Sequence, residues 1–224
     1  MHSTKYSRGL LDKPLNKTLI FDFDGTLVDS KKIIYQCFQE VTEKIAPLRL
    51  SYAKNILIGP PLRDAALKIL GQDHKNKLNN FIKLFIALHD DQLILNTQPY
   101  PNVTETLKIL HEQNIPMSIA TNKRQSPTLK LIDHYGWKKY FKKIECSDDK
   151  KKIRNKYQMI QDILKTNPEF IYGYYVGDTV SDGISSNLSK IPFIKASYGY
   201  GENQDWEGVV VAKKINKISD LIDD

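Results

Sequence analysis

The sequence predicts an α/β fold, in which a mostly parallel sheet carries helices on both faces and a separate helical segment interrupts the chain. Three observations support this fold class. Short apolar runs end at polar residues, amphipathic helical patterns separate those runs, and one long segment shows helical spacing alone. The 224 residues, 41% of them hydrophobic, are enough for one full core and a small second domain.

Five apolar runs are expected to form strands. They span residues 18–23, 115–120, 170–176, 191–194 and 209–211. Amphipathic patterns in 103–110, after the start signal Pro101-Asn102, and in 157–165 predict the helices between them. Strands that alternate with helices indicate βαβ units. Ligands of such sheets bind beyond the carboxyl ends of the strands, so we expect the functional residues there.

The segment 30–98 differs from the rest of the chain. Its apolar residues recur at helical spacing, as in Ile33-Ile34-x2-Cys37-Phe38, and it shows no strand-like alternation. We therefore predict a core domain formed by residues 1–29 and 99–224, with residues 30–98 inserted as a helical domain.

Composition excludes several classes of function. The net charge is +7, but the lysines are scattered and only Lys150–Lys152 forms a dense run, so we expect no nucleic-acid partner. No apolar run approaches the roughly 20 residues that cross a membrane, and residues 1–17 are polar. We therefore expect a cytoplasmic protein without a membrane partner. Cys37 and Cys146 match no metal-binding pattern and are expected to be reduced thiols.

The run Asp22-Phe23-Asp24-Gly25-Thr26 closes the first predicted strand. Two residues apart in an extended chain, Asp22 and Asp24 point to the same side. Two neighbouring carboxylates imply a cation between them, and Gly25 lets the backbone turn tightly against a ligand. An ordinary turn is the alternative for this run taken alone, because Asp and Gly are common turn residues.

Three motifs in order resemble the haloacid dehalogenase superfamily of phosphatases. The run LIFDFDGTLVDS, residues 19–30, is similar to the first motif of that superfamily. Residues 119–123 (IATNK) resemble the second motif, a strand that ends in Thr. Residues 176–182 (VGDTVSD) resemble the fourth, Gly-Asp-x-x-x-Asp. The resemblance runs from about residue 17 to the C-terminus and implies a Rossmann-like core.

The third motif requires a lysine on the helix before the fourth motif. Lys156, which opens the predicted helix 157–165, is the choice here, and Lys150, Lys151 and Lys152 are rivals. Many phosphoglycolate-phosphatase-like members carry Lys-Pro-x-Pro at this place and this chain does not, so the pattern leaves the choice of lysine open.

Spacing between the motifs implies a lid of the first type for this superfamily. Thr121 follows Asp22 by 99 positions, whereas Lys156 follows Thr121 by only 35. Only the first interval has room for an inserted domain. Within it, residues 58–64 (IGPPLRD) resemble the substrate loop of phosphoglycolate-phosphatase-like members, which makes Arg63 a candidate substrate ligand. A plain turn between two helices is the alternative.

The resemblance also implies a role for each matching residue. Asp22 attacks phosphorus and becomes the aspartyl-phosphate, and Asp24 acts as general acid and then as general base. The implied metal is Mg²⁺, held by Asp22, the backbone carbonyl of Asp24, Asp178 and, directly or through water, Asp182. The implied phosphate and substrate ligands are Gly25, Thr121, Asn122, Lys156 and Arg63.

These assignments predict a magnesium-dependent phosphatase that hydrolyses a small phosphorylated metabolite, as a monomer or weak dimer. Phosphoglycolate, a nucleotide, a sugar phosphate and pyrophosphate all remain open as substrates. A sugar phosphomutase is the alternative enzyme, because it keeps both Asp22 and Asp24 and the same lid type. A catalytically silent binding member is the second alternative, although it predicts losses among the motif residues and none is visible.

Overall fold

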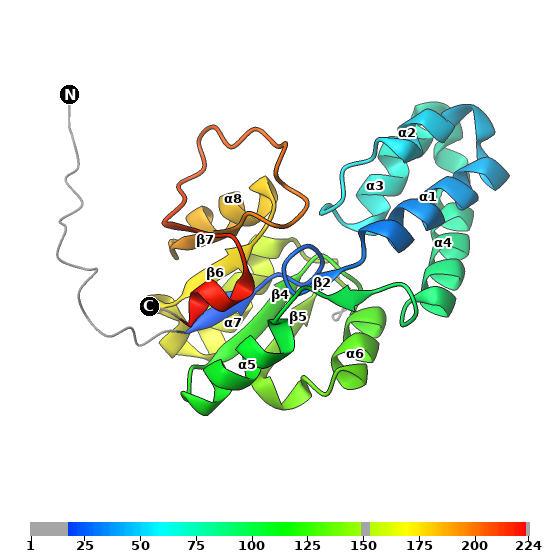
Figure 1. The fold of residues 1–224 in the computed structure, drawn as a ribbon. Coiled ribbons are helices and arrows are strands. Elements are labelled where there is room, and N and C mark those ends of the chain that lie inside the picture. Colours follow the sequence, from blue (N-terminus) through cyan, green and yellow to red (C-terminus); the bar gives the residue numbers. More distant parts are fainter. Residues whose placement is uncertain (1–17, 149–152, 223–224) are drawn as a thin grey trace, which may run out of the picture.

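A six-stranded parallel sheet forms the centre of the computed structural model, which describes residues 18–148 and 153–222 (Figure 1). The strand order is β5-β4-β1-β6-β7-β8. The strands are β1 (Leu19–Phe21), β4 (Met117–Thr121), β5 (Phe141–Cys146), β6 (Tyr174–Gly177), β7 (Phe193–Ala196) and β8 (Lys213–Ile215). All of their pairings are parallel, so the carboxyl ends of the strands meet at one edge of the sheet.

Helices cover both faces of the sheet, as predicted. On one face lie α5 (Val103–Glu112) and α6 (Gln125–His134), and on the other lie α7 (Lys156–Thr166) and α8 (Val180–Leu188). The alternation of β1 explains this arrangement. Leu19 and Phe21 pack into the cluster with α5, whereas Ile20 packs into the cluster with α7.

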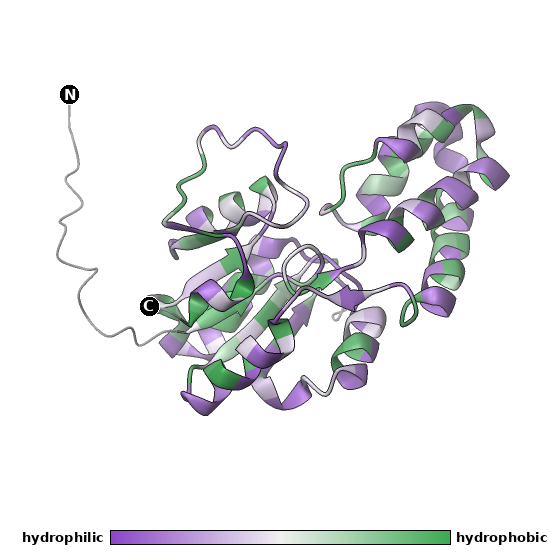
Figure 2. Ribbon diagram, viewed as in Figure 1, coloured by the Kyte–Doolittle hydropathy of each residue, from purple (hydrophilic) through white to green (hydrophobic). Residues whose placement is uncertain are grey.

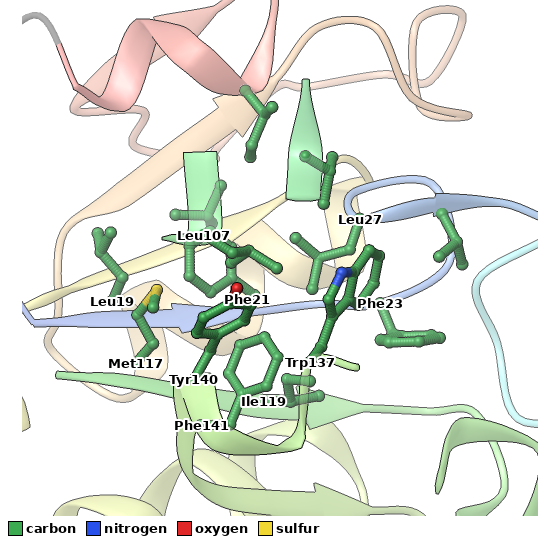
Figure 3. Close-up of a cluster of buried hydrophobic side chains, with 14 of the residues drawn as sticks. Leu19, Phe21, Phe23, Leu27, Leu107, Met117, Ile119, Trp137, Tyr140 and Phe141 are labelled. Carbon is green, nitrogen blue, oxygen red and sulfur yellow. The ribbon is translucent and has the colours of Figure 1, made fainter. Parts of the chain in front are cut away.

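The larger core cluster is rich in aromatic rings. Phe21 meets Phe141 edge-on at 6.5 Å between ring centroids, and Phe23 meets Trp137 in the same way at 6.4 Å (Figure 3). Phe23 belongs to the loop that follows β1, between the two aspartates of the first motif. Its full burial anchors that loop against the core and limits the movement of the carboxylates on either side.

The helical segment packs around a hydrophobic cluster of its own. It contains α1 (Lys31–Ile45), α2 (Leu50–Lys54), α3 (Leu62–Leu70) and α4 (Leu78–Gln92). At its centre the ring of Phe38 contacts the rings of Phe81 and Phe85. Figure 2 shows hydrophilic and hydrophobic residues alternating along these helices, the pattern of amphipathic helices with one buried side.

A short two-stranded ladder joins the helical segment to the sheet. The antiparallel strands β2 (Val28–Asp29) and β3 (Gln98–Pro99) pair Asp29 with Gln98, at the points where the chain leaves the core and returns. The helical segment thus has a narrow, paired connection. Its division from the core as an independent domain at residues 30–98 stays a prediction.

Two predicted strands differ from the structure. Residues 170–172 belong to a 3-10 helix, Pro168–Tyr172, and the strand begins only at Tyr174. The run 209–211 forms no strand. Instead Val209 and Val211 pack against the cluster on the α7 face, and the edge strand follows at Lys213–Ile215. Strand β5 is not among the predicted strands, because its sequence FKKIEC is neither a continuous apolar run nor a regular apolar/polar alternation.

Two further expectations concern the cysteines and the membrane. Cys37 and Cys146 are buried thiols, as expected. Within residues 18–148 and 153–222, every helix is too short or too polar to cross a bilayer.

Replacing Phe81 with Ala should destabilise the helical segment selectively. The side chain is fully buried and contacts the ring of Phe38, so its truncation costs about 3 to 5 kcal/mol. Hydrogen exchange should show lost protection in α1 and α4, while β1, β4 and β6 keep theirs. The exposed Lys83→Ala on the same helix is the control. Equal loss of protection in the sheet would contradict an independently packed helical domain.

Candidate active site

Polar side chains gather where the three central strands end. Asp22 follows β1, Thr121 is the last residue of β4, and Asp178 follows β6. Because β1 lies between β4 and β6 in the sheet, these three residues are neighbours although about 100 and 57 positions separate them in sequence. The structure therefore brings together the three motifs identified in the sequence.

Three carboxylates form a buried acidic cluster at this edge. Asp22, Asp178 and Asp182 each offer an oxygen, and these oxygens lie within 4.8 Å of one another. Asp182 stands in the first turn of α8 and accepts hydrogen bonds from the backbone N–H and hydroxyl of Thr179, at 2.8 and 2.7 Å. This set of hard oxygen donors suits a divalent cation such as Mg²⁺.

The electrostatics of the cluster also favour a cation. Burial raises the pKa of Asp22 to about 6, although Lys156 opposes this shift, and the neighbouring Asp182 raises it further. The pKa of Asp178 is raised well above its usual value by burial and by the nearby charges of Asp182 and Asp22. Oδ1 of Asp22 is buried and has no hydrogen-bond partner among the described residues. The residues present thus fit a bound metal ion.

Lys156 is the cation that the structure itself supplies to the cluster. Its Nζ lies 2.8 Å from Oδ2 of Asp22 and also pairs with Asp182. Burial lowers the pKa of Lys156, but the two carboxylates outweigh burial and raise it above its usual value. The lysine is the first residue of α7, and the reciprocal capping bonds of Asn155 and Gln158 hold that helix start in place. The rivals Lys150, Lys151 and Lys152 lie outside the described residues.

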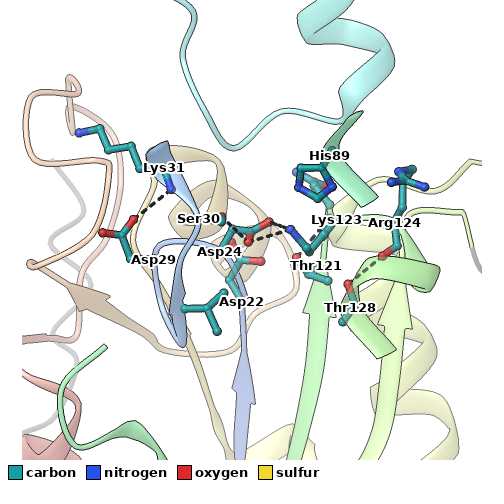
Figure 4. Close-up of polar contacts among 12 residues, drawn as sticks. Asp22, Asp24, Asp29, Ser30, Lys31, His89, Thr121, Lys123, Arg124 and Thr128 are labelled. Atoms are coloured by element: carbon teal, nitrogen blue, oxygen red, sulfur yellow. Dashed lines mark hydrogen bonds and ion pairs between the residues drawn. The ribbon is translucent and has the colours of Figure 1, made fainter. Parts of the chain in front are cut away.

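Asp24 lies apart from the acidic cluster, beside a different cation. Both of its carboxylate oxygens are 3.0 Å from Nζ of Lys123, and Oδ1 accepts a hydrogen bond from the hydroxyl of Ser30 at 2.6 Å (Figure 4). Neither Lys123 nor Ser30 is among the site residues predicted from the sequence. The available signal was their position inside the second and first motifs.

Gly25 occupies a position that only glycine can fill. Its φ is +85°, and a Cβ at this residue would lie 2.2 Å from Oδ2 of Asp178. The same carboxylate accepts hydrogen bonds from the hydroxyl of Thr26 at 3.0 Å and from the backbone N–H of Tyr200 at 2.7 Å. The tight turn after β1 therefore packs directly against Asp178.

The helical segment reaches the site through the loop before α3. The side-chain amide of Asn122 donates a hydrogen bond to the carbonyl of Gly59 at 2.8 Å, which ties this loop to the end of β4. Gly59 and Leu62 line the cavity above Asp22 and Asp24. Arg63 is exposed on α3 and does not line the cavity in this structure, so its assignment as a substrate ligand stays a prediction.

Residues on and near α4 and α6 complete the cavity, and they are not among the site residues predicted from the sequence. His89 is buried on α4, and Arg124 precedes α6 (Figure 4). Arg124 forms an ion pair with Asp90. His89 follows an apolar helical pattern in which a histidine resembles an ordinary core residue. The sequence pattern alone therefore does not distinguish His89 as a cavity residue from an ordinary core residue.

Comparison with known proteins yields one family and several relatives. The model described as haloacid dehalogenase-like hydrolase matches residues 19–196. A phosphoglycolate phosphatase of Rhodobacter capsulatus is 28% identical over 81% of this chain and 84% of its own length. A pyrophosphatase of Halalkalibacterium halodurans is 30% identical over 61% of this chain and 62% of its own. A solved haloacid dehalogenase-like hydrolase of Bacteroides fragilis, 21% identical, has the same fold, with a TM-score of 0.80 over 92% of this chain and 99% of that one.

Replacing Asp178 with Asn should stabilise the metal-free protein. The carboxylate is buried beside Asp22 and Asp182, so its charge is unfavourable at neutral pH without a cation. We expect a gain of roughly 1 kcal/mol at pH 7.5 in chelator, or about 2 to 4 °C in Tm. Added Mg²⁺ should then raise the Tm of the wild type but not that of the variant.

The pH dependence of this effect has a definite sign. A carboxyl whose pKa is raised on folding, as that of Asp178 is, stabilises the protein at low pH and loses that contribution as pH rises through the folded value. The gain from Asp178→Asn should accordingly shrink when melting is measured at pH 5. An equal response of wild type and variant to Mg²⁺ would contradict a metal site at the cluster.

Proposed function

The chain belongs to the haloacid dehalogenase-like hydrolase family, and on this basis we propose that it is a magnesium-dependent phosphatase that hydrolyses a small phosphate monoester through an aspartyl-phosphate on Asp22. The observation that carries the proposal is the state of the Asp22 carboxylate. Oδ2 pairs with Lys156, whereas Oδ1 is left without a partner among the described residues, and Asp22 borders the cavity. One oxygen is thus held in place while the other is available for attack.

Asp24 is suited to move protons in both steps. It also lines the cavity, and Lys123 and Ser30 fix its carboxylate from two sides. In the first step it gives a proton to the departing alcohol oxygen. In the second it takes a proton from the water that attacks the aspartyl-phosphate. Holding Asp24 apart from the acidic cluster lets it change charge without disturbing Asp22.

The phosphate oxygens have ligands on several elements. Thr121 lies at the end of β4 beside Asp22, and the backbone N–H of Asn122 follows it. Lys156 and Gly25 contribute a positive charge and a close backbone approach. Phosphoryl transfer depends on positioning and on neutralising charge, and these groups provide both.

A magnesium ion would be held by Asp22, the backbone carbonyl of Asp24, Asp178 and Asp182. Bound there, it would offset the repulsion between the nucleophile and the phosphate oxygens. The four residues lie at one edge of the sheet, and the raised pKa of Asp178 and the closeness of the oxygens of Asp22, Asp178 and Asp182 support this assignment.

Replacing Asp22 with Asn should abolish turnover while the fold stays intact. The amide keeps the size of the side chain but is not a competent nucleophile. Phosphate release with Mg²⁺, measured on a panel of phosphate monoesters, should fall to background. Asp133→Asn, an exposed carboxylate on α6, should behave as wild type. Retention of more than a small fraction of the wild-type rate would contradict the assignment of the nucleophile.

Replacing Lys156 with Ala should lower the rate by about a hundredfold or more. The change removes the only cation that pairs with both Asp22 and Asp182 among the described residues, so transition-state charge is less well stabilised. The exposed Lys165→Ala on the same helix should change the rate little.

The rival lysines provide a second comparison. Lys150→Ala, Lys151→Ala and Lys152→Ala are each expected to keep nearly the full rate. Circular dichroism should confirm that every variant is folded. A collapse at Lys152 with Lys156→Ala near normal would move the third motif upstream.

A further inference from the structure

The cavity above Asp22 has two chemically different walls. The wall from the core is polar and contains the motif residues. The wall from the helical segment is apolar. It consists of Ile34 and Phe38 from α1, Leu57 from the loop between α2 and α3, Leu62 from α3 and Phe85 from α4. Beyond these two walls the cavity opens to solvent.

The positive charges that line the cavity are already paired. Among the described lining residues the cations are Lys123 and Arg124. Lys123 lies 3.0 Å from the carboxylate of Asp24, and Arg124 pairs with Asp90. Lys156 is engaged by Asp22 and Asp182. A second anionic group on a substrate would therefore find no unpaired cation among the described residues that line the cavity.

His89 does not supply the missing charge. Its ring stacks on Phe85 at 5.5 Å between centroids, and its Nδ1 lies 3.2 Å from Oδ1 of Asp90. Burial lowers its pKa, despite the opposing effect of Asp90, so the imidazole is neutral at neutral pH. A neutral imidazole in this wall can form one hydrogen bond but cannot balance an anion.

Anionic and apolar leaving groups differ strongly in the free energy of binding to such a pocket. An anion buried against aliphatic and aromatic side chains loses its hydration and gains no partner. An apolar substituent gains from leaving water, in proportion to the area that it buries. Phosphoglycolate and pyrophosphate both carry a second anionic group, and the hydroxyls of a sugar would also lose hydration here.

We propose that the group released with the phosphate is an uncharged alcohol with an apolar body, so that the substrate is the phosphate monoester of a hydrophobic alcohol. This inference rests on the proposed phosphatase function and narrows its substrate class. The core wall carries the chemistry, which is common to all phosphate monoesters, and the apolar wall selects the alcohol.

The first test is a comparison of kcat/KM within matched substrates. Ethyl, butyl and hexyl phosphate have similar leaving groups and differ only in apolar surface. We expect kcat/KM to rise about tenfold from ethyl to butyl phosphate. Propyl phosphate should exceed phosphoglycolate, which has nearly the same shape and a carboxylate in place of the outer two carbons. A flat alkyl series, or a preference for phosphoglycolate or pyrophosphate, would overturn the proposal.

The second test places a charge in the apolar wall. Leu57 lines the cavity and is 45% exposed, so Leu57→Lys should fold. It should shift the ratio of kcat/KM for propyl phosphate over phosphoglycolate toward phosphoglycolate by roughly fivefold. Leu48→Lys, on the same helical segment but 90% exposed and outside the cavity, is the control and should leave the ratio unchanged. Equal ratios in both variants would contradict the assignment of this wall.

A measurement of ligand binding tests the apolar pocket separately from the proposed phosphatase activity. Calorimetry of hexylphosphonate and phosphonoacetate, which cannot be hydrolysed as esters, measures the pocket without turnover. Tighter binding of hexylphosphonate than of phosphonoacetate supports an apolar pocket. If at the same time no ester is hydrolysed, only the phosphatase function is rejected. Tighter binding of phosphonoacetate would overturn the apolar pocket whatever the activity.

Discussion

The buried pairing of Lys156 with Asp22 and Asp182 is the interaction on which the site depends. Three carboxylates share a space within which their oxygens lie less than 4.8 Å apart, and one lysine offsets only part of their charge. Such a cluster is unfavourable unless its members are fixed by other bonds. Asp182 is held by Thr179, Asp178 by Thr26 and Tyr200, and Lys156 by the capped start of α7. A bound cation can compensate the negative charge of the three carboxylates that Lys156 leaves unbalanced.

Strand order explains how distant motifs reach this cluster. With β1 between β4 and β6, three consecutive carboxyl ends deliver Thr121, Asp22 and Asp178 to one place. The loop after β1 has a second constraint, because Phe23 is buried in the core while Asp22 and Asp24 on either side face the site. The backbone of this loop is thus anchored by hydrophobic packing, and Gly25 allows it to close on Asp178.

The sequence was sufficient for the motifs and for the helical segment, because both depend on local spacing. Asp22, Asp24 and Asp178 were predicted from their positions after apolar runs and from the motif resemblance, and Lys156 from its place at a helix start. The structure brings Lys156 and Asp22 into contact, and their roles stay predictions. The strand order, β5 and the path of residues 209–211 depend on long-range pairing that no local pattern encodes. Tyr200 could not be predicted as part of the site for the same reason, because its contacts are long-range. Its backbone N–H donates to Asp178, and its hydroxyl accepts a hydrogen bond from the backbone N–H of Ser30 at 2.8 Å.

Tyr200 also links the acidic cluster to the point where the helical segment begins. Ser30 precedes α1, and its hydroxyl donates to Asp24. A single chain of contacts thus runs from Asp178 through Tyr200 and Ser30 to Asp24. The start of the helical segment and the carboxylate of Asp24 are therefore held by the same residue, Ser30. Since the same segment supplies the apolar wall, the proposed site of the leaving group is joined directly to Asp24, the proposed general acid.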